Sequence, residues 1–266
     1  SLLPPPPPQP SNSTTTLSTA MLAGDDPDSS SAAEPLSGKK ADLKSLSRAL
    51  FSYPYFAVFV LTWFVAGSGL MLINNLKPLA QAHGCAELAP RLCSIVSASN
   101  CIGRLFYGTT SDVLLRRYAT PRPYALAMVC VQMGVAMLLL KIGGAAALVC
   151  ACLVGGTAYG GINSLLPPVA SEIFGLELIG LMYPFTPLGM VIGSYTIATL
   201  LASHMLPTNP TMSPTYQHIL ILLCAGCLIS AILTCVVGVR TRQLYRSLAR
   251  ELRPPPWGEP GRRAGG

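Results

Sequence analysis

The stretch Gly108-Thr-Thr-Ser-Asp112-Val-Leu-Leu-Arg116-Arg117 lies between two long apolar segments. An acid follows the glycine by four residues, and two arginines follow the acid by four and five residues. A glycine lets two helices approach closely, an acid can face the positive N-terminal end of a neighbouring helix, and arginines can pair with acids. The pattern therefore predicts a closely packed, charged contact at the mouth of a membrane helix bundle, formed by Gly108, Asp112, Arg116 and Arg117.

The composition agrees with a membrane protein. Of the 266 residues, 51% are hydrophobic and 11% are charged, and the mean hydropathy is +0.49. A soluble domain usually carries about a quarter charged residues. The net charge of +7 is concentrated near the two ends of the chain, without an interleaved basic and aromatic patch. We therefore expect a lipid bilayer rather than nucleic acid as the partner of this chain.

Six apolar segments, each about 20 residues long, predict an all-α polytopic membrane protein with six transmembrane helices. We expect three parts: a disordered Pro/Ser-rich segment at 1–50, a six-helix half-domain at 51–242, and a basic Pro-rich tail at 243–266. The expected spans are 53–75, 92–111, 123–142, 145–167, 178–203 and 218–239.

The distribution of lysine and arginine predicts the orientation of these spans. Fourteen basic residues fall in the N-terminal segment, the 112–122 link and the C-terminal tail, whereas Lys77, Arg91 and Lys141 fall on the other side. Because basic residues accumulate on the cytoplasmic side, both termini and the Gly108–Arg117 stretch are expected in the cytoplasm. The host membrane is not indicated.

The Gly108–Arg117 stretch resembles the signature loop of the major facilitator superfamily, with Val113 and Leu115 at positions where a basic residue and a glycine are common. This resemblance implies a cytoplasmic gate formed by Gly108, Asp112, Arg116 and Arg117. Further stretches resemble the C-terminal half of the plant and protist nodulin-like, or nuclear-fusion-defective, transporters. These stretches are Gly67–Leu76, Asn100–Arg104, Gly160–Gly175 and Gly193-Ser194-Tyr195.

This resemblance implies one half of a twelve-helix carrier, with the substrate site between two six-helix halves. The chain then looks like a fragment whose partner is the missing N-terminal half, and residues 1–50 look like a central cytoplasmic loop. The implied function is transport of a small solute by alternating access. Two alternatives stay open: a half-size carrier that acts as a dimer, and a non-transporting scaffold or receptor on the same fold.

Arg104 is the one ionisable side chain deep within an expected span, and such residues are costly in a membrane unless they serve a function. The related oxalate–formate and monocarboxylate carriers hold an anionic substrate with an arginine here, so the resemblance implies an organic anion. Arg104 could instead pack or pair with Asp112 at the cytoplasmic end. Asn74 and Asn163 adjoin glycine- or proline-interrupted helix, and they complete the candidate substrate-binding set.

Nothing in the sequence indicates an enzyme, a cofactor or a metal site. Cys224 and Cys227 have the spacing of a redox or zinc motif, but they lie mid-span without a histidine or second pair nearby, and small-residue packing is expected. Cys85 and Cys93 could form a disulfide, although free thiols are the favoured interpretation. No nucleophilic triad or phosphate loop is present.

Overall fold

The computed structural model describes residues 43–175, 180, 182–201 and 214–251. These residues form helices joined by short links, and none of them lies in a strand. The helices are α2 (Leu43–Leu50), α3 (Tyr53–Leu61), η1 (Thr62–Ala66), α4 (Gly67–Asn74), α5 (Leu76–Ala82), η2 (Ala86–Leu88), α6 (Ala89–Tyr118), α7 (Arg122–Ile142), α8 (Ala145–Phe174), η3 (Tyr183–Phe185), α10 (Leu188–Gly193), η4 (Ser194–Leu201), α12 (Pro214–Arg240) and α13 (Arg242–Glu251).

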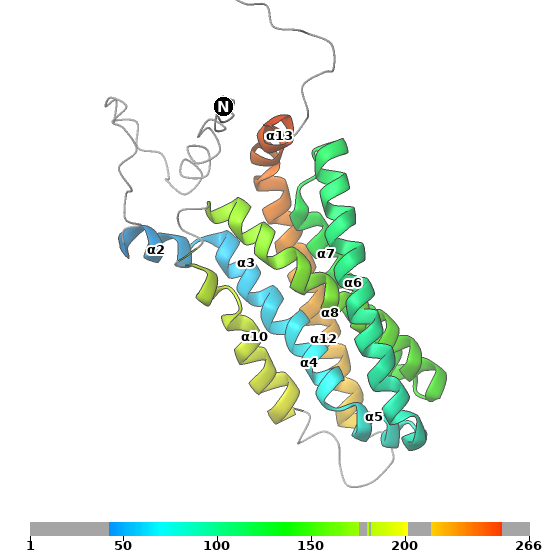
Figure 1. The fold of residues 1–266 in the computed structure, drawn as a ribbon. Helices are drawn as coiled ribbons and strands as arrows, with labels where there is room; N and C mark the ends of the chain where they lie inside the picture. The colour runs from blue at the N-terminus through cyan, green and yellow to red at the C-terminus, as the bar shows by residue number, and fades with distance from the viewer. Residues whose placement is uncertain (1–42, 176–179, 181, 202–213, 252–266) are drawn as a thin grey trace, which may run out of the picture.

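The long helices form a bundle of two layers. Figure 1 shows α10, α3–α4, α8 and α6 next to one another, with α7 and α12 behind them. The closest pairs are α6 with α8, α7 with α8, and α7 with α12. Both α2 and α13 lie at one end of the bundle, here called the α2/α13 end, and α5 lies at the other (Figure 1).

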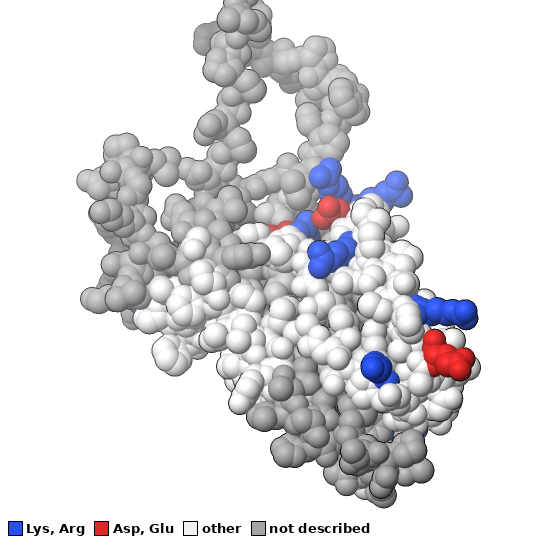
Figure 2. All heavy atoms as spheres, turned by 60° about the horizontal axis from the view of Figure 1, so that its bottom comes forward, with Lys and Arg blue, Asp and Glu red and all other residues white. Residues whose placement is uncertain are grey.

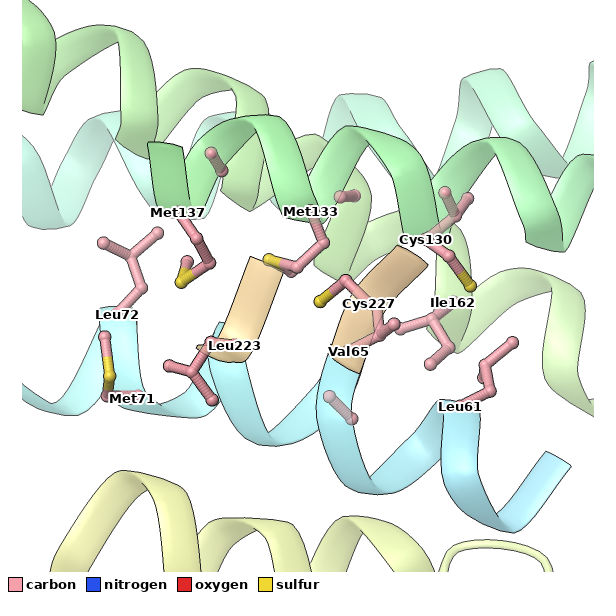
Figure 3. Packing of buried hydrophobic residues seen from close by; sticks show 14 of the residues in the cluster. Leu61, Val65, Met71, Leu72, Cys130, Met133, Met137, Ile162, Leu223 and Cys227 are labelled. Atoms are coloured by element: carbon pink, nitrogen blue, oxygen red, sulfur yellow. The ribbon is translucent and has the colours of Figure 1, made fainter. Parts of the chain in front are cut away.

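The core lies between the layers and is rich in small and sulfur-containing side chains. Met133 and Met137 of α7 meet Leu223 and Cys227 of α12, with Val65 of η1 opposite them (Figure 3). All nine cysteines have free thiols. Cys227 is fully buried, so it serves the packing expected for it, as methionine and cysteine commonly do.

Four helical stretches are long and apolar enough to cross a membrane: Tyr53–Asn74, Arg122–Ile142, Ala145–Phe174 and Tyr216–Arg240. The surface view agrees, because most of it is free of charged side chains (Figure 2). Of the other two expected spans, 92–111 lies within α6, which is less apolar, and the described part of 178–203 holds the short apolar helix Leu188–Ile197. The described residues are thus compatible with an integral membrane protein, and the count of six spans stays a prediction.

The Gly108–Arg117 stretch is helical throughout, which corrects the expected link at 112–122. No glycine or proline follows Gly108 until Pro121, and α6 ends at Ala119, which has the left-handed conformation with φ of 50°. Pro121 then precedes α7. Alanine rarely adopts a positive φ, and proline restricts the residue before it. The connection between α6 and α7 is therefore only 119–121.

The folded part extends beyond the expected limits of 51 and 242. α2 precedes residue 51, and its Ala49 is fully buried. α13 follows residue 241, and its Tyr245 is fully buried against Leu115 of α6. The rest of the expected N-terminal disordered segment and of the C-terminal tail lies outside the described residues.

Glycines allow the backbones of two helix pairs to touch. A methyl group added to Gly160 of α8 would overlap the carbonyl oxygen of Asn100 in α6. A methyl group on Gly193 of α10 would likewise overlap the carbonyl oxygen of Trp63 in η1. The small-residue spacing at Gly156/Gly160 and Gly189/Gly193 therefore serves close packing of helices.

Gly108 does not have the close approach expected of it. A methyl group there would meet only the Cβ of Ser164, at 3.9 Å. The close contact falls earlier in α6, where a methyl group on Gly103 would overlap the backbone of Thr157.

Candidate functional site

Arg104 lies halfway along α6, level with the middle of α8. A methyl group on Gly160, in the middle of α8, would lie 2.9 Å from the backbone nitrogen of Arg104. The Arg104 side chain is exposed, and its Nε donates a hydrogen bond of 3.2 Å to Oδ1 of Asn100, one turn earlier. The guanidinium therefore retains donors for another group. The pairing with Asp112 considered from the sequence is not formed, because Asp112 pairs with Arg122.

Asn163 and Asn74 occupy different settings. Asn163 is half-buried in α8, and its Nδ2 donates to the carbonyl oxygen of Tyr159 at 2.8 Å. Pro167 follows within the same helix and cannot donate to the carbonyl of Asn163, because proline lacks an N–H. Asn74 is exposed at the end of α4, next to the break that precedes α5.

Two of the three candidate residues, Arg104 and Asn163, lie near one another, whereas Asn74 lies apart from them. Gly160, which contacts the Arg104 backbone, lies three residues before Asn163. Arg104 and Asn163 therefore lie at a similar level of the α6–α8 pair. No contact joins Asn74 to either of them among the interactions of the described residues.

A polar network joins α6, α7 and α8 near Arg104. The Tyr107 hydroxyl donates to Oε1 of Gln132. Nε2 of Gln132 donates to the Val154 carbonyl oxygen at 3.1 Å and to the Thr157 hydroxyl. Interhelical hydrogen bonds of this kind fix helices against one another in an apolar environment. The simplest role of Gln132 is therefore to hold these three helices together.

A charge cluster lies at the α2/α13 end and is formed by Asp112, Arg122 and Glu172. Nη2 of Arg122 is 2.7 Å from Oδ1 of Asp112, and Nη1 is 3.2 Å from Oε1 of Glu172. The side chains of Arg122 and Glu172 are 13% and 12% exposed, and that of Asp112 is 53% exposed. One arginine from the start of α7 thus bridges the last part of α6 and the end of α8.

The arginines of the sequence motif do not take part in this cluster. Arg116 and Arg117 are exposed in the last turn of α6, and neither forms an ion pair with a described residue. Of the gate predicted at Gly108, Asp112, Arg116 and Arg117, the structure brings only Asp112 into an ion pair.

Tyr245 of α13 closes the charge cluster from outside the bundle. Burial, together with the neighbouring Glu172 carboxylate, raises the pKa of the Tyr245 hydroxyl well above its usual value. The hydroxyl therefore stays protonated, and it lies near the Glu172 carboxylate. Leu115 of α6 and Ala249 of α13 are buried beside the Tyr245 ring, so α13 is packed onto the bundle.

The sequence argument missed Arg122, Glu172 and Tyr245 as a group. Arg122 counted only as one of the basic residues that indicate orientation, and Glu172 only as part of the Gly160–Gly175 stretch. A signal was present, because a carboxylate directly after a long apolar segment needs a partner when it is buried. The partner could not be named without the positions of α7 and α13.

The described residues contain no group of three or more His, Cys, Asp or Glu side chains placed to hold a metal ion. The polar groups described above are amides, hydroxyls and paired charges on helices.

Comparison with protein families gives one match. The model for the C-terminal domain of NFD4 matches residues 39–248, which is most of the chain. The chain belongs to this family. The match agrees with the resemblance to the C-terminal half of nuclear-fusion-defective proteins, and it extends from the start of α2 into α13. No curated protein and no solved structure matches the chain.

Proposed function

We propose that this NFD4-family chain is the C-terminal half of a major facilitator carrier, which moves a small solute across a membrane by alternating access. In this proposal α6 and the segment from Tyr183 to Leu201 cross the membrane together with the four more apolar stretches, and the substrate lies between this half and an N-terminal half.

The observation that carries the proposal is the exposed guanidinium of Arg104, level with the middle of an apolar helix. A charge at this depth is costly when it faces lipid, and such side chains usually face a protein partner or a water-filled cavity. We therefore expect the surface around Arg104 to face a second half and a hydrated site. A planar guanidinium with free donors suits a carboxylate, so the proposed solute is an organic anion.

The charge cluster supplies a latch for alternating access. Arg122 joins α6, α7 and α8 at the α2/α13 end, which the distribution of basic residues predicts to be cytoplasmic. Breaking its ion pairs would free the ends of these helices to move apart. In the proposed cycle the pairs hold one access state and weaken in the other.

The proposal is tested with the chain joined to the rest of its protein. The full-length carrier in proteoliposomes should take up one class of organic anion saturably, and the same anion should raise its unfolding temperature. The 266-residue chain alone should do neither. Saturable uptake by the chain alone would instead establish a half-size carrier, and a full-length protein that binds no solute in a panel of anions and neutral metabolites would favour a scaffold or receptor.

A further inference from the structure

A pocket opens at the α2/α13 end, away from Arg104 and beside the charge cluster. Its volume is about 350 Å³, and its walls come from α2, the start of α3, the ends of α8 and α12, and Leu244 of α13. The lining includes Arg48 of α2, Phe51 and Ser52 of the α2–α3 link, and Arg240 of α12. Residues far apart in the sequence thus form one cavity where the first and last described long helices meet.

The charges in this pocket are all positive. Arg48 and Arg240 are its ionisable cations, and its lining contains no aspartate or glutamate. Neither arginine forms an ion pair with any carboxylate in the described part of the chain. Two guanidinium groups without carboxylate partners favour an anionic ligand, and a phosphate matches their paired donors.

One of the two guanidinium groups is held in place. The Arg240 guanidinium carbon lies 4.8 Å from the centre of the Tyr53 ring, which is a cation–π distance. The Tyr53 hydroxyl donates to the carbonyl oxygen of Leu233 at 3.2 Å, which anchors the ring to α12. The pocket therefore presents one of its cations on a rigid support.

The pocket lies at the expected boundary between hydrocarbon and headgroups. Tyr53 begins one membrane-length apolar stretch, and Arg240 ends another. Phe51, between α2 and α3, is 92% exposed. α2 carries leucines at Leu43, Leu46 and Leu50 and lies across the end of the bundle (Figure 1). An amphipathic helix and an exposed aromatic side chain are typical of a segment that lies at a membrane surface.

We propose that this pocket binds the phosphate of an anionic glycerophospholipid from the leaflet that surrounds the α2/α13 end. This inference rests on the membrane placement in the proposed function, but it does not depend on a solute or on transport. The guanidinium groups of Arg48 and Arg240 hold the phosphate, while Phe51 lies beside the acyl chains.

The test measures lipid binding by the full-length protein in nanodiscs of phosphatidylcholine that contain increasing amounts of phosphatidylglycerol. Native mass spectrometry counts the retained phosphatidylglycerol. The wild type should bind one molecule saturably, and the double variant Arg48→Gln/Arg240→Gln should bind at least tenfold more weakly. The matched control is Arg242→Gln/Arg246→Gln, which removes two exposed arginines of α13 that do not line the pocket. This control should retain the wild-type affinity.

Two further arms make the result decisive. Inorganic phosphate should not displace phosphatidylglycerol, and displacement at millimolar concentration would show a site for soluble phosphate instead. Equal losses in the two double variants would show a general surface-charge effect and overturn the proposal. If the double variant folds poorly, Arg48→Gln alone serves, because exposed Arg48 lies outside the core. Unchanged phosphatidylglycerol binding in Arg48→Gln would also overturn the proposal. A variant that loses solute uptake but binds lipid normally would count only against the carrier function.

Discussion

Asp112 and Arg122 form an ion pair of 2.7 Å across the short connection between α6 and α7. The same guanidinium also reaches Glu172 at the end of α8. Because Arg122 and Glu172 are largely buried and Asp112 is half-exposed, the two pairs should differ in energy. Breaking a buried pair from one side costs about 3–5 kcal/mol, whereas an exposed pair contributes about 1 kcal/mol or less.

Arg122→Gln should therefore lower the unfolding temperature of the detergent-solubilised protein much more than Asp112→Asn does. The physical reason is that Arg122→Gln leaves Glu172 buried without its counter-charge. The double variant Arg122→Gln/Glu172→Gln should recover part of the loss. Arg116→Gln is the matched control, because Arg116 is exposed in the same region. A wild-type unfolding temperature in Arg122→Gln would show that the cluster does not stabilise the fold.

The same cluster gives a prediction for transport. In the proposed carrier, Asp112→Ala of the full-length protein should reduce uptake strongly while largely sparing expression, because in this proposal the ion pair biases one access state. This half-exposed pair contributes about 1 kcal/mol or less, and a bias of about 1 kcal/mol corresponds to roughly a fivefold change in population. Uptake and surface abundance are measured together, with Arg116→Gln and Arg117→Gln for comparison. Wild-type uptake in Asp112→Ala would exclude the latch, and equal losses in all three variants would favour the gate first predicted from the sequence.

The packing of α6 on α8 predicts a contrast between two glycines. Gly160→Ala should destabilise the protein, because the added methyl group would overlap backbone that cannot move without displacing α6. Gly108→Ala should be neutral or stabilising, since there is room for the methyl group and alanine favours a helix by about 1 kcal/mol over glycine. Unfolding temperatures of the two variants test this contrast, and a larger loss for Gly108→Ala would contradict the observed crossing.

These residues show what the sequence could and could not predict. Apolar periods and lengths predicted helices at all six segments, because each helix satisfies its own backbone. The partners of charged groups depend on neighbouring helices, so Asp112 was predicted without Arg122, and Glu172 and Tyr245 were not predicted as part of the site. Gly108 was assigned a close approach that belongs to Gly103, since spacing alone cannot show which face of α6 meets α8. The helical fold of 243–251 was missed because α13 is stabilised by packing on α6 rather than by its own apolar length.

Stability should fall in mild acid because of His83, which follows α5 and is buried. Burial lowers the pKa of its imidazole, and an interaction with the Gly144 backbone opposes this in part. The unfolded chain, with a histidine pKa of about 6.5, binds the proton more readily than the folded one. This contribution is therefore fully present above about pH 6.5 and is lost as the pH falls below that value.

The unfolding temperature at pH 8 and at pH 5 measures this effect. The unfolding temperature of the wild type should fall more between pH 8 and pH 5 than that of His83→Gln, because glutamine cannot take up the proton. An identical loss in both proteins would assign the acid sensitivity to other groups.

Tyr245 predicts that α13 belongs to the folded domain. Tyr245→Ala should destabilise the protein by about 3–5 kcal/mol, as for other large buried aromatic side chains, and should make the chain after Arg240 sensitive to protease. Tyr245→Phe keeps the ring and removes only the hydroxyl near Glu172. It should therefore lower the free energy of unfolding by less than Tyr245→Ala does. If both variants resist protease like the wild type, α13 is not held to the bundle by this side chain.

Arg104 gives the sharpest test of the solute. If the solute is a carboxylate held by the guanidinium, Arg104→Lys should fail to restore affinity, because lysine cannot make the planar two-pronged contact. If Arg104 only packs or pairs within the protein, Arg104→Lys should keep the wild-type affinity, and Arg104→Ala should mainly lower abundance. Apparent affinity and surface abundance are therefore measured together in both variants.

Asn100→Ala is a useful comparison, since it removes the acceptor that now holds the Nε of Arg104 but leaves the guanidinium in place. Wild-type affinity in Arg104→Ala would reject the anion site, because no other described cation of this half lies midway along a long helix.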